Sequence, residues 1–405
     1  MNHSHGRYGR SAGGVVAMVA VVMMVTVCFS AVLSDESSAA APDYNRYYYD
    51  KLDLYDGAEF MRDVYDKMLM ITGPEANHTI SMSIGGYGIE RCQDLACLAR
   101  TVFIQDHPEY FWLNIYNTDP EQVGDTYRIT FLPAEYTSGV SIDTEADKLN
   151  AIEEIDRTIE GWGISDTDSD IVKVEKINKG ITGLLNKGPS GTDGMAYRNM
   201  ATAFLSDEHK VVCAGYASSF KYCCDKYNVP CIYVSGQCGG NHAWNNVMID
   251  GKWYMVDPMY NEGTDITDHL LLGSIKSVDH VPSLNILEFP DPVGLFPELS
   301  EKGYYQYTIV FKDYDGTVLD TRVYERGDKV EFPRTPSRDG YKFDYWGGKD
   351  TEPYLATKDM TFTAVYQGDN GDKGDSSSGC NLVIAGIVLA ALSVMAVPLM
   401  RYIRP

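Results

Sequence analysis

The segment 211–261 contains a cysteine, a histidine and an aspartate whose spacing could assemble an activated thiol. Cys213 directly precedes a run, 214–227, in which apolar residues recur at steps of three and four. That spacing predicts a helix, and Pro230 marks its end because proline cannot continue the hydrogen-bond ladder. Cys213 is therefore expected in the first helical turn, where free N–H groups and the helix dipole favour thiolate over thiol.

His242 and Asp257 lie at the start of one run rich in β-formers and at the end of the next, and these runs flank an Asp-Gly pair at 250–251. Asp-Gly between two such runs is a strong signal for a two-residue β-hairpin. In that register Trp244 faces Asp257, and His242 points to the same face as Trp244. Diagonal neighbours in a hairpin lie about 7 Å apart at their backbones. The hairpin therefore predicts an imidazole–carboxylate pair.

Together these three groups predict nucleophilic catalysis by a thiol. His242 would accept the Cys213 proton, Asp257 would hold the imidazole in one tautomer, and the thiolate would attack an acyl carbon. The amide of Gly215 and the other amides at the helix start are candidate donors to the oxyanion. A glycine-rich stretch at 236–240 precedes His242 and suggests a loop that a substrate chain can approach closely.

A zinc site is the main chemical alternative for this segment. Its candidate ligands are Cys213, Cys223, Cys224, Cys231, Cys238 and His242. Their spacing lacks the paired C-x-x-C knuckles that are typical of structural zinc sites. We therefore expect no metal and no cofactor.

The same residues resemble the pattern of the transglutaminase-like superfamily, whose fold is papain-like. The family pattern is a Cys followed by Gly-aromatic-Ala, then His-Ala-Trp-Asn, then Trp-Tyr-x-x-Asp. It reads here as Cys213-Ala214-Gly215-Tyr216-Ala217, His242-Ala243-Trp244-Asn245 and Trp253-Tyr254-Met255-Val256-Asp257. The resemblance implies that Cys213, His242 and Asp257 are the catalytic triad, and that Gly215, Tyr216 and Trp244 support the substrate site.

Two departures from the family pattern leave the choice of substrate open. Val211 stands where such sequences often carry glycine, and Met259-Tyr260 follows Asp257-Pro258 where Thr-Trp is common. The family includes transamidases, proteases, amidases and inactive members. No calcium site of the animal type carries over to this sequence.

Both ends of the chain carry long apolar stretches. Residues 1–41, with an uncharged stretch at 12–33, are interpreted as a signal peptide or, alternatively, as a retained N-terminal membrane anchor. Residues 381–400 predict a transmembrane helix, and 401–405 predict a cytoplasmic tail because positive charge belongs inside. The expected location is the cell membrane, with a single C-terminal span and the main body outside.

Charge and cysteine content narrow the class of protein further. The net charge of −23 argues against nucleic acid and anionic lipid as partners. Nine cysteines in an exported chain suggest disulfides, and seven remain once Cys28 and Cys380 are assigned to the apolar ends. Seven is consistent with three bridges and a free Cys213, and Cys92 with Cys97 is a candidate local bridge.

The organisation of the chain predicts an α+β protein built from several parts. A leader of helices and strands, 43–145, precedes a papain-like, transglutaminase-like catalytic core at 146–290. A β-rich module at 304–367 resembles the Listeria–Bacteroides (internalin B-type) repeat, a small β-grasp-like module of cell walls. The polar segment 368–380 is expected to be a flexible tether.

The sequence therefore predicts a membrane-anchored extracytoplasmic cysteine enzyme that acts on amide bonds through a thioester acyl-enzyme. Protease or amidase activity is slightly favoured over transglutaminase-type transfer because water is always present. The expected partners are a protein or peptide substrate outside the cell, and the cell envelope or surface through the β-rich module. The alternative is a catalytically inactive surface adhesion or binding protein on the same scaffold.

Overall fold

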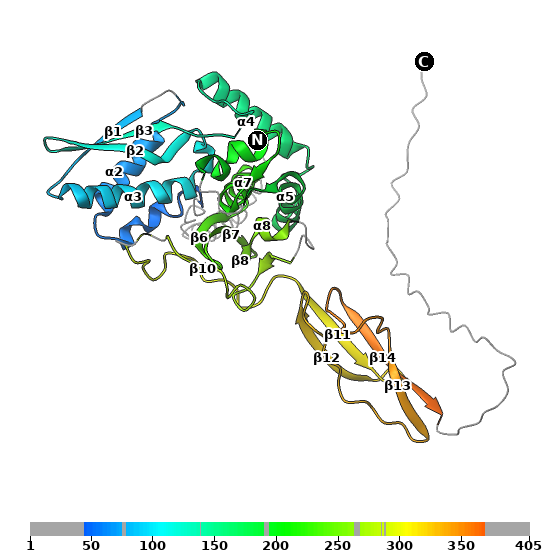
Figure 1. The fold of residues 1–405 in the computed structure, drawn as a ribbon. Helices are drawn as coiled ribbons and strands as arrows, with labels where there is room; N and C mark the ends of the chain where they lie inside the picture. The colour runs from blue at the N-terminus through cyan, green and yellow to red at the C-terminus, as the bar shows by residue number, and fades with distance from the viewer. Residues whose placement is uncertain are drawn as a thin grey trace, which may run out of the picture. The chain divides into compact units, whose positions relative to one another are not determined.

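The computed structural model describes residues 44–368 except 75–77, 138, 190–193, 263–267, 285 and 287–288 (Figure 1). A large unit extends to Ile309 and also includes 322–330 and 353–360, and the rest of the C-terminal part belongs to a small unit. Within the described part, every helix is too short or too polar to span a bilayer. The predicted membrane stretches at 1–41 and 381–400, the tail and nearly all of the tether lie outside the described residues.

The N-terminal part of the large unit combines two helices with a three-stranded sheet. The helices α2 (Ala58–Leu69) and α3 (Ile89–Asp106) pack against each other and lie along the sheet (Figure 1). Its antiparallel strands follow the order β1-β3-β2, with bounds β1 (His78–Ser83), β2 (Leu113–Val123) and β3 (Thr126–Pro133). Three 3₁₀ helices complete this part: η1 (Tyr44–Arg46), η2 (Tyr49–Leu54) and η3 (Pro108–Tyr110).

A buried carboxylate ties the start of the described chain to α3. Asp106, at the end of α3, accepts hydrogen bonds from the amides of Tyr48 and Tyr49, both at 3.0 Å, and from the Tyr65 hydroxyl at 2.9 Å. These bonds offset the cost of burying a carboxylate. The tyrosine-rich segment at 44–55 is thereby fixed against the helical layer.

The middle of the chain is helical and supports the helix that carries Cys213. Its helices are α4 (Glu145–Glu160), α5 (Asp170–Leu184), the 3₁₀ helix η4 (Met195–Arg198), α6 (Met200–Leu205) and α7 (Cys213–Lys226). Thr144 and Asp147 form a capping box at the start of α4, which satisfies amides that have no partner within the helix. The α5 and α6 helices both pack against α7.

A five-stranded antiparallel sheet lies against α7. The strand order is β10-β6-β7-β8-β9, with bounds β6 (Cys231–Gln237), β7 (Asn241–Ile249), β8 (Lys252–Val256), β9 (Leu270–Leu272) and β10 (Val281–Pro282). A two-stranded parallel pair, β4 (Asn186–Lys187) and β5 (Lys210–Val211), leads into α7, and the short helix α8 (Pro258–Asn261) follows β8. The α7 helix contacts β6 and β7 (Figure 1).

The face of α7 that meets the sheet is apolar, as its sequence spacing predicts. Ala217, Phe220 and Cys224 are all fully buried. The same helix also buries a charge: the Lys221 ammonium is inaccessible to solvent and lies 2.5 Å from a carboxylate oxygen of Asp225, one turn further along. The helix that carries Cys213 is therefore held by apolar packing together with an internal ion pair.

The C-terminal part of the described chain holds a four-stranded sheet with its own apolar centre. The strand order is β12-β11-β14-β13, with bounds β11 (Gln306–Lys312), β12 (Val318–Glu325), β13 (Tyr341–Gly347) and β14 (Met360–Gly368). Phe311, Trp346 and Phe362 are buried, and the Phe311 ring lies 5.3 Å from that of Trp346 and 5.6 Å from that of Phe362. Aromatic burial of this kind stabilises a small sheet.

The cysteines of the described region are all free, which contradicts the expected disulfides. Cys92 is buried and Cys97 is exposed, although both belong to α3. Residues five apart on a helix are rotated by about 140° from each other. The two thiols therefore point to different sides of α3, and the expected local bridge between them was wrong.

Candidate active site

Cys213 is the first residue of α7, and its side chain is half-buried. The preceding Val212 has extended backbone, and its carbonyl accepts a hydrogen bond from the Gly215 amide at 2.9 Å. Glycine is required at 215 because a Cβ there would lie 2.6 Å from the Cβ of Val211. This close packing of the first helical turn on β5 holds the thiol at the positive end of the helix.

The imidazole of His242 lies close enough to the Cys213 thiol to alter its pKa. Burial by itself would raise the pKa of the thiol. Hydrogen bonds from His242 and from the amides of Ala243 and Ala214 outweigh that effect and lower the pKa of Cys213 below its ordinary value. The surroundings of the sulfur therefore favour the thiolate.

The hairpin of β7 and β8 positions the histidine and the aspartate. Its two turn residues, Asp250 and Gly251, have positive φ angles of 51° and 75°, as a two-residue hairpin turn of the primed type requires. The ladder pairs Ile249 with Lys252 and Asn245 with Val256. The predicted hairpin and its register are thus confirmed.

Asp257 follows directly after β8 and is fully buried. One of its oxygens, Oδ2, lies 2.6 Å from His242 Nε2 and 3.1 Å from His280 Nε2. The other, Oδ1, accepts a hydrogen bond from the Tyr260 amide at 3.1 Å and caps α8. Burial opposes ionisation, but the bonds from His242 and His280 hold the pKa of Asp257 at about 2.

The imidazole of His242 is held by Asp257 at Nε2 and by contacts with two aromatic rings. Its ring stacks with those of Trp244, at 6.0 Å between centroids, and Tyr260, at 4.9 Å. Burial disfavours the charged ring, yet the hydrogen bonds to Asp257 and Cys213 raise the pKa of His242 to about 9. A raised imidazole pKa beside a lowered thiol pKa favours a thiolate–imidazolium pair at neutral pH.

The three residues expected to support the substrate site have different places. Trp244 is almost fully buried and packs against His242, so it helps to position the imidazole. Tyr216 is fully buried and donates to Glu262 at 3.0 Å, so it supports the fold beneath the site. The Gly215 amide already donates to a carbonyl, which overturns its expected role as an oxyanion donor. The amide of Cys213 itself, at the first helical position, is the better candidate.

The predicted zinc alternative does not assemble from its candidate ligands. Cys223, Cys224 and Cys231 are fully buried in the apolar core. Across the described residues, the groups of ligating atoms that come together around the site instead involve Asp257, Asp279 and His280. Of the six expected ligands, only Cys238 and His242 belong to such a group.

His280 is the site residue that sequence reasoning missed. It lies just before β10, is buried, and reaches Asp257 through Nε2. Its ring is 5.0 Å from that of Trp244 and 5.7 Å from that of His242. A lone histidine in a loop 23 residues after Asp257 carries no local sequence pattern, because only the pairing of β10 with β6 brings it to the site.

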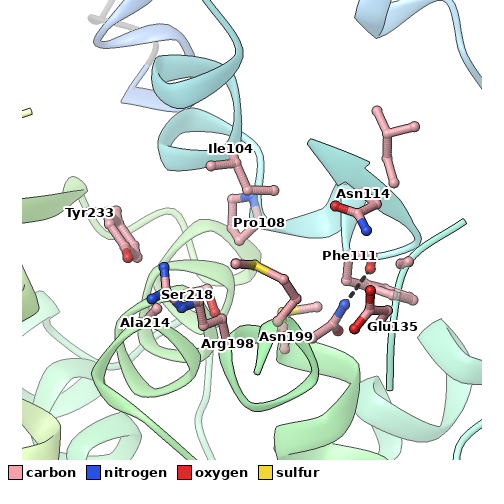
Figure 2. A pocket seen from close by; sticks show the side chains of 14 residues that line it. Ile104, Pro108, Phe111, Asn114, Glu135, Arg198, Asn199, Ala214, Ser218 and Tyr233 are labelled. Carbon is pink, nitrogen blue, oxygen red and sulfur yellow. Dashed lines mark hydrogen bonds between the residues drawn. The ribbon is translucent and has the colours of Figure 1, made fainter. Parts of the chain in front are cut away.

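A cavity of about 60 Å³ lies beside the first half of α7 (Figure 2). Ala214 and Ser218 of α7 line one side, and Ile104 and Pro108 face them from the region where α3 ends. Asn199 donates to the Phe111 carbonyl at 2.6 Å across one end. The remaining lining is mainly apolar, with Arg198 and Glu135 as its charged groups, and the space suffices for a few water molecules.

The segment that carries the thiol, imidazole and carboxylate matches a known family. A sequence model of the Transglutaminase-like superfamily matches residues 166–258, a range that includes Cys213, His242 and Asp257. The similarity to this family concerns residues 166–258 of the chain. The mixed α and β fold therefore contains a segment that is similar to the transglutaminase-like core, in agreement with the resemblance seen in the sequence.

Solved structures with partial similarity include a TGase that is 14% identical, with a TM-score of 0.26. This match covers 38% of this chain and 46% of that chain. A proposed cysteine protease from Cytophaga hutchinsonii is 14% identical, TM-score 0.23, over 35% of this chain and 61% of that one. The periplasmic domain of TgpA from Pseudomonas aeruginosa, bound to ethylmercury, is 17% identical with a TM-score of 0.17, and the match covers 34% of this chain and 56% of that one. This chain thus spans about half the length of these structures. No curated protein matches it.

Proposed function

We propose that the transglutaminase-like domain is a cysteine enzyme that cleaves or transfers amide bonds through a thioester acyl-enzyme. The observation that carries this proposal is the grouping of the Cys213 thiol, His242 and the buried Asp257, in which His242 Nε2 lies 2.6 Å from Asp257 Oδ2 and the imidazole lowers the pKa of the thiol. Such a grouping activates a thiol and stores its proton during the reaction. Cys213 acts as the nucleophile, His242 as the acid and base, and Asp257 as the residue that orients the imidazole.

The proposed reaction has two balanced stages. In the first, the Cys213 thiolate forms a bond to the acyl carbon, the carbon–nitrogen bond breaks, and His242 donates its proton to the leaving amine. The negative oxygen that forms during attack would be stabilised by the Cys213 amide at the helix start. In the second stage neutral His242 takes a proton from water or from an amine, which attacks the thioester and releases Cys213.

Water as the second substrate gives a carboxylic acid, whereas an amine gives a new amide. We favour hydrolysis of a peptide or isopeptide bond, because water is always available as the second substrate. The mainly apolar cavity next to α7 would suit an uncharged side chain of a protein or peptide substrate.

The cellular setting of this activity is also part of the proposal. The apolar stretches at the two ends of the sequence and the net charge of −23 favour an extracytoplasmic body anchored in the cell membrane. The four-stranded C-terminal sheet would serve as a contact module for the cell envelope or surface, as its sequence resemblance to the internalin B-type repeat implies.

A direct test uses the full-length chain with a mixture of fluorogenic peptides and, separately, a glutamine-containing protein with a labelled primary amine. Release of peptide fragments would support hydrolysis. Incorporation of the labelled amine without cleavage would contradict hydrolysis and support transamidation. Cys213→Ala should abolish either activity, while Cys97→Ala, which removes an exposed thiol of α3, should leave it intact. No activity in wild type, together with partner binding unaffected by Cys213→Ala, would favour the inactive adhesion protein.

A further inference from the structure

We infer that Cys238, Asp279 and His280 form a binding site for a zinc-class divalent cation next to the proposed triad. The Cys238 Sγ lies 3.7 Å from Asp279 Oδ2 and 3.9 Å from His280 Nδ1. Asp279 Oδ1 and His280 Nδ1 are 2.8 Å apart. A thiol, an imidazole nitrogen and a carboxylate oxygen thus converge on one small volume.

The spacing of these atoms fits tetrahedral coordination. With zinc–sulfur bonds of about 2.3 Å and zinc–nitrogen or zinc–oxygen bonds of about 2.0–2.1 Å, neighbouring ligand atoms lie roughly 3.3–3.6 Å apart. The separations from Cys238 Sγ of 3.7 Å and 3.9 Å differ from that range by a few tenths of an ångström. Rotation of the exposed Asp279 side chain suffices to open the 2.8 Å pair. Water would complete the fourth position.

The type of donor selects the cation. Calcium and magnesium require mainly oxygen ligands, whereas thiolate with imidazole favours zinc and similar ions. Cys238 is half-buried and Asp279 is exposed, so an ion can enter from solvent. His280 is buried and would be the fixed ligand.

The scaffold holds the two ligand-bearing segments together without a metal. Strand β10 pairs with the end of β6, so that Val281 lies opposite Gln237 and Pro282 opposite Gly236. Cys238 and His280 directly flank this pairing. The Cys238 amide donates to the Gly240 carbonyl at 2.8 Å, which closes the turn that presents the thiol. Preorganisation of this kind lowers the cost of binding.

The other nitrogen of His280 connects this site to the proposed triad. A metal on Nδ1 leaves the proton on Nε2, and that N–H points at Asp257 Oδ2, 3.1 Å away. A carboxylate that accepts from a metal-bound histidine is the usual outer partner of zinc sites. The same oxygen accepts from His242, so occupancy of the site would weaken the bond that holds the base. This regulatory consequence rests on the proposed function, whereas the binding site does not.

Cobalt titration of full-length Cys213→Ala protein tests the site independently of catalysis. The expected result is one cobalt equivalent with a near-ultraviolet thiolate-to-cobalt band, displaced by zinc. Cys238→Ser should remove the band and weaken zinc binding by about tenfold or more, and Asp279→Asn, an exposed position that leaves the fold intact, should weaken it less. Cys97→Ser is the matched thiol control and should change nothing.

Two outcomes would overturn the site. One is a band or an affinity unchanged in Cys238→Ser and in Asp279→Asn. The other is cobalt binding that gives no thiolate band and is lost in His242→Ala. That result would place the ion on His242, Asp257 and His280, the other group of ligating atoms. Failure of the proposed function alone is recognised separately, because cobalt would still bind to a protein that has no activity in any substrate assay.

Discussion

Replacement of Asp257 by Asn tests how the thiol is activated. Asparagine keeps the size of the side chain and can still accept the hydrogen bond from the Tyr260 amide. It removes the negative charge that lies 2.6 Å from His242 Nε2. If the buried carboxylate is what stabilises the imidazolium, the thiolate at Cys213 should become scarce at neutral pH.

The magnitude follows from the pKa of the histidine. The pKa of His242 is about 9 instead of the ordinary 6.5, which corresponds to roughly 3 kcal/mol of extra stabilisation of the imidazolium. Asp257 supplies at least as much of this as Cys213 does, so the pKa of His242 should fall toward its ordinary value in the variant. A thiol returned to its ordinary pKa of 9.0 is only about 1% thiolate at pH 7. We therefore expect Cys213 alkylation at pH 7 to slow by between about tenfold and a hundredfold.

The assay is iodoacetamide labelling of the full-length chain from pH 5 to 9, with each cysteine quantified by mass spectrometry. Wild type should label Cys213 with a midpoint below pH 9, and Asp257→Asn should move that midpoint toward 9 or above. Cys97, which is exposed, supplies an internal reference rate. Asp250→Asn is the matched control because it removes a carboxylate from the same hairpin at a turn position that asparagine tolerates. A Cys213 rate at pH 7 within threefold of wild type in Asp257→Asn would refute this account of activation.

Three further predictions concern the scaffold. Lys221→Ala leaves the Asp225 carboxylate without its buried partner, so urea denaturation should show a free energy of unfolding that is lower by about 3–5 kcal/mol. The double variant Lys221→Met with Asp225→Leu should recover most of this loss. Gly236→Ala should lower the free energy of unfolding by about 1–3 kcal/mol and should lower activity, because the new Cβ would lie 2.5 Å from the Trp244 ring. An unchanged melting temperature would contradict this packing. The pKa of Asp257 in the folded protein is about 2, below the ordinary 3.8. Ionised Asp257 therefore stabilises the fold above about pH 4 by roughly 2–3 kcal/mol, and this contribution is lost as the pH falls through 2. Asp257→Asn should flatten that part of a stability–pH curve, and a curve identical to wild type would exclude this contribution.

The parts of the site that local rules determine were predictable from sequence. The Asp-Gly turn sets the register of β7 and β8, and the apolar spacing after Cys213 sets the helix. Both signals act within about fifteen residues, where turn geometry and helical periodicity are decisive. The resemblance to the transglutaminase-like pattern extended these local signals to the packing of α7 on the hairpin.

Other features depend on contacts that no local pattern encodes. His280 reaches Asp257 only because β10 pairs with β6 across more than forty residues. The occupation of the Gly215 amide by the Val212 carbonyl depends on how tightly the first turn of α7 winds. The expected disulfides failed because cysteine counts say nothing about where thiols point on a helix, as Cys92 and Cys97 illustrate.

The sharing of one carboxylate oxygen by two imidazoles connects the chemistry of the site to its architecture. His242 is placed by the β7–β8 hairpin and His280 by the β6–β10 pairing, yet both donate to Asp257 Oδ2. The hydrogen bonds of one buried carboxylate therefore depend on two separate strand pairings. A change that loosens β10 would leave the Cys213–His242 geometry intact while altering the charge that Asp257 can offer to His242. We therefore expect the edge of the sheet to influence the pKa of the Cys213 thiol through Asp257, although it contributes neither the thiol nor the imidazole next to it.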